Sequence, residues 1–108
     1  MTKRKIRQMT GSYEDYLLHS LRDKEECVAY LQVALEEYQK DNNAQALLLA
    51  LRHVAQAQGG IAHLAQKAHL NRESLYKTLS GKGNPRLQTL GALLKGLGFR
   101  LSIQQVDD

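Results

Sequence analysis

Five polar residues at the start of one short predicted helix have the side-chain chemistry needed to read the edges of DNA bases. Arginine can pair bidentately with guanine, glutamate can accept a hydrogen bond from cytosine, and serine can bond to either kind of base. The apolar residues of the same segment, Leu75 and Leu79, are four positions apart and therefore share one face. A short helix with a polar N-terminal half and apolar anchors is typical of a segment that enters the major groove. The five residues are Arg72, Glu73, Ser74, Tyr76 and Lys77.

The sequence around these residues, GIAHLAQKAHLNRESLYKTLSG from Gly60 to Gly81, predicts two short helices joined by a tight turn. Asn71 is a natural N-cap for the second helix, because its side-chain oxygen can accept a hydrogen bond from an amide of the first turn. His69 stands in the turn, and histidine adopts positive φ more often than most residues. These features favour a helix-turn-helix. A plain helical hairpin of a small all-α protein is the alternative that this pattern leaves open.

The remaining chain is also predicted to be helical, because leucine dominates its apolar residues and it contains one proline. We expect a flexible basic arm over residues 1–12, an N-terminal helical extension over 13–42 and the helix-turn-helix domain over 43–108. Within the extension, residues 13–21 could form a short helix or an extended arm. Asp23 is expected to cap a helix that reaches about Tyr38. Two more helices are predicted over residues 44–58, capped by Asn43, and over residues 86–97.

The C-terminal segment alternates apolar and polar residues from Phe99 to Ile103, which predicts a short strand. A lone strand needs a hydrogen-bonding partner for its backbone. Two partners are open at this stage: residues 13–21, if they are extended, or the same strand of a second copy. The second possibility predicts a homodimer and would place two recognition helices for a palindromic site.

Charge is distributed unevenly along the chain, whose formal net charge is +4. Residues 1–10 and residues 59–108 each carry +4, whereas residues 11–58 have four basic and eight acidic residues. A basic C-terminal half suits an anionic polymer, and an acidic N-terminal half suits a basic protein partner. Two solvated faces without a partner would give the same pattern.

Residue types that support enzymatic chemistry do not form a recognisable pattern. The four histidines show no pairing at i,i+4, and Cys27 has no companion cysteine and is expected to be a buried, inert thiol. We therefore expect no catalytic residues, no metal and no cofactor; a nuclease would need His63, His69 and Tyr76 to converge. The chain has no signal peptide and no apolar run that could span a bilayer, so a cytoplasmic protein is expected.

Residues 13–103 resemble one particular group of proteins. The most specific shared residues are Arg72-Glu73-Ser74-Leu75-Tyr76 followed by Gly83-Asn84-Pro85-Arg86, and the resemblance continues through Leu97-Gly98-Phe99-Arg100-Leu101. The chain is identified by these residues as similar to the probable addiction-module antidote proteins, which are Xre-type (phage-repressor-like) antitoxins related to HigA. Two positions depart from the group, since His69 replaces its usual glycine and Asn71 its usual serine. Both replacements suit the turn geometry.

The resemblance implies an antidote that represses its own operon by binding double-stranded operator DNA and neutralises a RelE/ParE-like toxin. By position, the five polar residues of the second short helix would face the major groove, and Lys82, Asn84 and Arg86 would lie against phosphate. The acidic helix of the N-terminal extension is the expected toxin surface, with Glu25, Glu36 and Glu37 as its binding residues. A stand-alone repressor of the same type, without a toxin partner, is the alternative.

Overall fold

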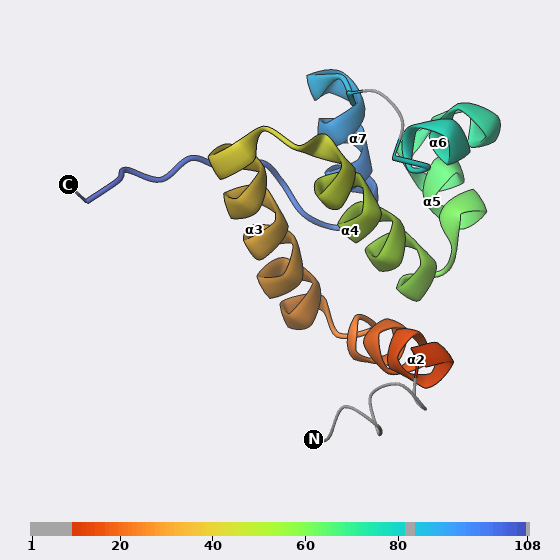
Figure 1. Cartoon of the computed structure of the whole chain (residues 1–108). Helices are drawn as coiled ribbons and strands as arrows, with labels where there is room; N and C mark the ends of the chain where they lie inside the picture. Colours follow the sequence, from red (N-terminus) through yellow and green to blue (C-terminus); the bar gives the residue numbers. More distant parts are fainter. Residues whose placement is uncertain (1–9, 82–83, 108) are drawn as a thin grey trace.

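The computed structural model describes residues 10–81 and 84–107, and it places six α-helices in these ranges (Figure 1). α4 lies between the long helix α3 and the pair formed by α5 and α6, and α2 lies against the end of the α3–α4 pair (Figure 1). The prediction of an all-helical chain is thus confirmed for these residues. The helices are α2 (Thr10–Ser20), α3 (Lys24–Asp41), α4 (Ala44–Ala57), α5 (Ile61–Ala68), α6 (Arg72–Thr78) and α7 (Leu87–Gly96).

Three predicted N-caps set where helices begin. The side chains of Asp23, Asn43 and Asn71 accept hydrogen bonds from backbone amides of α3, α4 and α6, respectively. Each side chain thereby satisfies one of the amides that a first turn leaves without a partner. The end of α3 was placed wrongly, because this helix continues three residues past Tyr38. It ends where Asn42 adopts the left-handed conformation, with φ of 57°.

The core is built mainly from leucines of every helix. α4 runs through its centre and buries seven residues, because its apolar positions form a broad stripe. Side chains that are almost completely enclosed come from α3, α4, α6 and α7 and from the residues that follow α2 and α6, so the N-terminal extension shares the core of the rest of the chain. They are Leu21, Cys27, Leu48, Leu51, Val54, Leu75, Leu79 and Leu93.

α5 and α7 approach each other closely at Gly96. A Cβ atom on this residue would lie 3.0 Å from Leu64 Cδ1 and 3.3 Å from Ala68 Cβ, so a larger residue would require these neighbours to shift by a few tenths of an ångström. Two residues after the end of α7, Gly98 adopts a φ of 92°, and the amide of Phe99 donates to the carbonyl oxygen of Leu94 at 2.7 Å. This Schellman-type ending brings Phe99 against the core.

Polar contacts also attach the N-terminal extension to α4. The side-chain amide of Gln58 donates to the backbone oxygens of Leu21 and Arg22, at 2.8 and 3.0 Å. Cys27 Sγ donates to the same Leu21 oxygen at 3.0 Å. The cysteine is fully buried, as expected, and burial raises the pKa of its thiol above the usual value. It is therefore a structural residue that fixes the turn between α2 and α3.

The predicted C-terminal strand is wrong for the described chain. Residues 99–107 form no strand: Phe99 packs against the core, and the segment passes α3 before it leaves the helices (Figure 1), with Ile103 98% exposed. The physical reason is that the one partner available within the chain, residues 13–21, is occupied by helix α2 through Ser20. The other predicted partner was the same strand of a second copy, and the structure of a single chain does not test that pairing. Residues 1–9 of the predicted arm lie outside the described residues.

Candidate nucleic-acid interface

The turn between α5 and α6 is three residues long and is fixed by backbone hydrogen bonds. His69 adopts the left-handed conformation, with φ of 57° and ψ of 42°. Its amide donates to the oxygen of Gln66, and the amide of Leu70 donates to the oxygen of Ala65 at 2.9 Å. These two bonds form a Schellman motif in which histidine occupies the position that glycine usually takes. Leu70 then packs against the core and Asn71 begins α6.

α6 exposes every one of the five residues that the sequence assigns to base reading. Leu75 and Leu79 are both buried and hold the helix against the rest of the domain, which leaves the opposite face free. Asn71 Oδ1 accepts from the amide of Ser74 at 3.0 Å, so the first turn is rigidly formed. Thus the structure brings together, on one solvent-facing helix surface, the residues Arg72, Glu73, Ser74, Tyr76 and Lys77.

Arg72 and Tyr76 contact each other on this surface. The guanidinium carbon lies 6.0 Å from the centroid of the tyrosine ring, which is a cation–π arrangement, and Tyr76 is 47% exposed. Their spacing of four residues predicts such a contact, since i and i+4 side chains are neighbours on a helix. A ring in this position restricts where the guanidinium can lie. An arginine held in this way can present a planar fork to a base.

The residues expected to contact phosphate follow α6 in the chain. Asn84 and Arg86 are both exposed, and Arg86 is the residue immediately before α7. Their exposure makes both side chains accessible to an external phosphate. Lys82, the third predicted phosphate contact, lies outside the described residues, and so does Gly83.

The acidic residues assigned to toxin binding are all exposed on α3. Glu25 and Glu36 are eleven positions apart, about three helical turns, and so lie on the same side of the helix. Glu37 is the next residue after Glu36 and therefore points in a different direction around the helix axis. Its Oε1 atom lies 3.6 Å from Lys40 Nζ, which makes an ion pair. This pair is exposed on both sides, so it contributes little to stability. α3 and the α5–α6 pair lie on opposite sides of α4 (Figure 1), so the two predicted binding surfaces are separate.

A half-buried hydrogen bond connects α3 with α4. Tyr30 Oη lies 2.8 Å from His53 Nδ1, and both side chains are half-buried. Burial lowers the pKa of His53 from its usual value, with the neighbouring Glu14 raising it and Arg52 lowering it more weakly. Burial likewise raises the pKa of Tyr30. This pair could not be predicted from sequence, because the two residues are 23 positions apart and face each other only after α3 and α4 pack.

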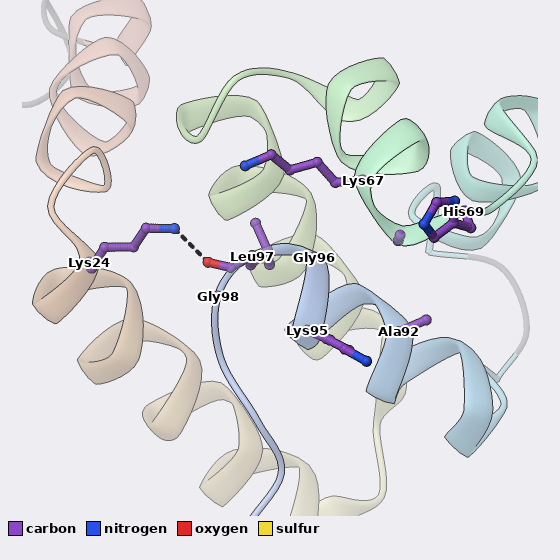
Figure 2. A pocket seen from close by; sticks show the side chains of 9 residues that line it. Lys24, Lys67, His69, Ala92, Lys95, Gly96, Leu97 and Gly98 are labelled. Carbon is purple, nitrogen blue, oxygen red and sulfur yellow. Dashed lines mark hydrogen bonds between the residues drawn. The ribbon is translucent and has the colours of Figure 1, made fainter.

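Three lysines and His69 surround a hollow of about 620 Å³ at the C-terminal ends of α5 and α7 (Figure 2). Lys67 and Lys95 stand in the last turns of these helices, where a cation interacts favourably with the unpaired carbonyl groups. Lys24 reaches across from α3 and donates to the carbonyl oxygen of Leu97. These helix-end contacts account for the positive charge of the hollow.

Neither a metal site nor a membrane segment is found in the described residues. No group of three or more His, Cys, Asp or Glu side chains is placed to hold a metal ion there. Within the same ranges, no helix has the length and hydropathy needed to cross a bilayer. His63 and His69 are both exposed, and no hydrogen bond in the described chain links either of them to Tyr76.

The geometry defines a small all-helical protein that exposes a polar helix after a three-residue turn. Residues 14–105 match the family described as "Probable addiction module antidote protein", and the chain belongs to this family. A protein of Haemophilus influenzae described as uncharacterized is 35% identical over 98 residues, which cover 90% of this chain and 96% of the relative. No solved structure matches the chain.

Proposed function

We propose that this antidote-family protein is the antitoxin of a type II toxin–antitoxin module and binds operator DNA through α6 as an autorepressor. The observation that supports DNA binding is the exposed surface of α6, where base-reading side chains stand on a helix anchored by two buried leucines. Arg72 provides a bidentate donor for guanine and Glu73 an acceptor for cytosine. Asn84, Arg86 and Lys82 are proposed to bind the flanking phosphates, which positions α6 without reading sequence.

The operator is proposed to be an inverted repeat read by a homodimer. A two-fold symmetric protein presents two copies of α6, and half-sites for such proteins lie about one helical turn, roughly 10 bp, apart. The basic residues 59–108 favour association with the phosphate backbone. Helix-turn-helix readers of the Xre type are the class that this arrangement resembles.

Toxin neutralisation is proposed to use the opposite, acidic side of the molecule. A toxin of the RelE/ParE type that acts on RNA must approach a polyanion and is therefore expected to be cationic. Glu25, Glu36 and Glu37 on α3 would attract such a protein and accelerate its association. Because α3 lies away from α6, one molecule could hold DNA and toxin at the same time (Figure 1).

One pair of experiments tests both halves of this proposal. Binding to the DNA upstream of its own gene should be saturable, and log affinity should fall linearly with log salt concentration. Co-expression with the product of the neighbouring reading frame should restore growth that this product alone inhibits. Operator binding without any growth-inhibiting neighbour would support the alternative, a stand-alone repressor. Absence of binding to the upstream DNA would contradict the autorepressor.

A further inference from the structure

Helix α2 carries two exposed tyrosines that the core does not need. Tyr13 is 61% exposed and Tyr16 is 69% exposed, whereas Leu17 and Leu21 hold the same helix against the core. The two tyrosines are three positions apart and are therefore neighbours on the helix surface. Tyrosine rings exposed in this way bury a large area at small entropic cost when a partner covers them, and tyrosine is enriched among residues that dominate binding energy.

A hollow of about 680 Å³ adjoins Tyr16, between α2 and the C-terminal part of α4. Its charged and titratable lining residues are Asp15, His19 and Arg22, and its walls include Leu18, Gln56 and Ala57. An aromatic ring beside a carboxylate suits a guanidinium or ammonium group, which can lie over the ring and pair with the acid. The hollow is large enough for a long basic side chain.

The surroundings of the hollow also select a cationic partner. Residues 13–42 contain eight acidic and three basic residues, a net charge of −5, although the whole chain is positive. Burial lowers the pKa of His53 on α4, and the neighbouring Glu14 of α2 partly offsets this effect, so a second carboxylate of α2 lies near α4. Two basic residues, His19 and Arg22, line the hollow, and Arg22, which is always charged, would oppose a cation there.

We propose that the cationic toxin docks across α2, with Tyr13 and Tyr16 as its anchors and a basic side chain of the toxin in the hollow beside Tyr16 and Asp15. This inference rests on the proposed function and adds to it the contact surface and its chemistry. The glutamates of α3 then act at the rim of the interface, where charges accelerate association more than they hold the complex together. The tyrosines hold the complex together.

The test measures binding of the purified product of the neighbouring reading frame by isothermal titration calorimetry. Tyr16→Ala should weaken this binding at least about tenfold. Tyr16→Phe should stay within about threefold of the wild type, because the ring is kept. Asp15→Asn should weaken binding severalfold, and Arg22→Gln should tighten it, because it removes a like charge from the hollow.

Tyr76→Ala is the matched control, because Tyr76 is also an exposed tyrosine but stands on α6. It should weaken operator binding and leave the affinity for the toxin unchanged, whereas Tyr16→Ala should do the reverse. Thermal unfolding of each variant checks that the fold is kept. A photo-reactive phenylalanine analogue at position 16 should cross-link to the toxin, and this readout does not depend on a loss of binding.

The possible failures are distinguishable. If the wild-type protein binds and neutralises the toxin but Tyr16→Ala binds it equally well, the docking surface is overturned while the proposed function stands. The docking surface is also overturned, and the proposed function stands, if the toxin cross-links only to photo-reactive residues placed on α3. If the wild-type protein neither binds nor neutralises the neighbouring product, the toxin half of the proposed function fails, and the docking surface fails with it.

Discussion

Lys24, the first residue of α3, donates a hydrogen bond from its ammonium group to the carbonyl oxygen of Leu97 at the end of α7 (Figure 2). The same ammonium lies 5.3 Å from the centroid of the Phe99 ring. The two residues are 73 positions apart, so this contact joins the first residue of α3, in the N-terminal extension, to the C-terminal end of α7, in the proposed DNA-binding domain. It places a cation where the helix dipole of α7 favours one.

Replacing Lys24 by Met should therefore destabilise the fold. Methionine keeps most of the apolar stem but removes the charged donor, and a hydrogen bond of this kind contributes about 1–2 kcal/mol at a partly exposed position. Lys40→Met is the control, because Lys40 forms the exposed pair with Glu37 and should change stability by less than about 0.5 kcal/mol. Urea unfolding measures both. Equal effects of the two substitutions would show that Lys24 has no special role.

Gly96 and Gly91 of α7 should respond in opposite directions to alanine. Gly96→Ala would push a Cβ against Leu64 and Ala68 and should cost about 1–3 kcal/mol. Gly91→Ala places its Cβ in ordinary van der Waals contact with Leu101 Cδ1, at 4.0 Å, and should stabilise the helix by up to about 1 kcal/mol. Thermal unfolding of the two variants compares them directly. Stabilisation by Gly96→Ala would contradict the close packing of α5 on α7.

Stability should fall as the pH is lowered below about 6.5, the usual pKa of histidine, because of His53. Burial lowers the pKa of its imidazole in the folded protein, so the unfolded chain takes up the proton first as the pH falls. In that interval the unfolded state binds more protons, and the free energy of unfolding decreases with decreasing pH. The loss stops once the pH is below the pKa of the folded state.

The variant His53→Gln should remove this part of the pH dependence. Urea midpoints measured at several pH values for the wild type and the variant isolate it as a difference. A glutamine can still bond to Tyr30, so the comparison changes the titration more than the packing. An identical slope in both proteins between pH 7 and pH 5 would contradict the assignment to His53 (the interval is roughly that of ordinary histidine titration).

Arg72→Ala and Arg86→Ala should affect DNA binding differently, the first through sequence selectivity and the second through overall affinity. Arg72→Ala should cost about 1–3 kcal/mol at one base position and relax selectivity there. Arg86→Ala, like Lys82→Ala, should weaken binding to all sequences alike and reduce the slope of log affinity against log salt by about one. Titrations with the operator and with single-base variants, each at several salt concentrations, separate the two effects. If Arg72→Ala instead weakened binding to all DNA sequences equally, Arg72 would contact phosphate rather than a base.

The N-caps were the part of the fold that local sequence determined. Asn71 and Asn43 cap where they were expected to, because a capping side chain bonds to amides two or three residues away and needs no distant partner. The exposed face of α6 was predictable for a similar reason. Once Leu75 and Leu79 define the inner face, helical geometry fixes which residues point outward.

Contacts between distant segments were decided by tertiary structure alone. Phe99–Ile103 has the alternation of a strand, yet a strand forms only with a partner, and α2 removed the partner that the chain could have supplied. Lys24 and Leu97, or Tyr30 and His53, meet because helices pack, and nothing in their sequence spacing encodes that. The exposure of Tyr13 and Tyr16 was likewise undecided, because an aromatic residue on an amphipathic segment is usually part of a core. Packing places Leu17 and Leu21 inward and leaves the tyrosines to solvent.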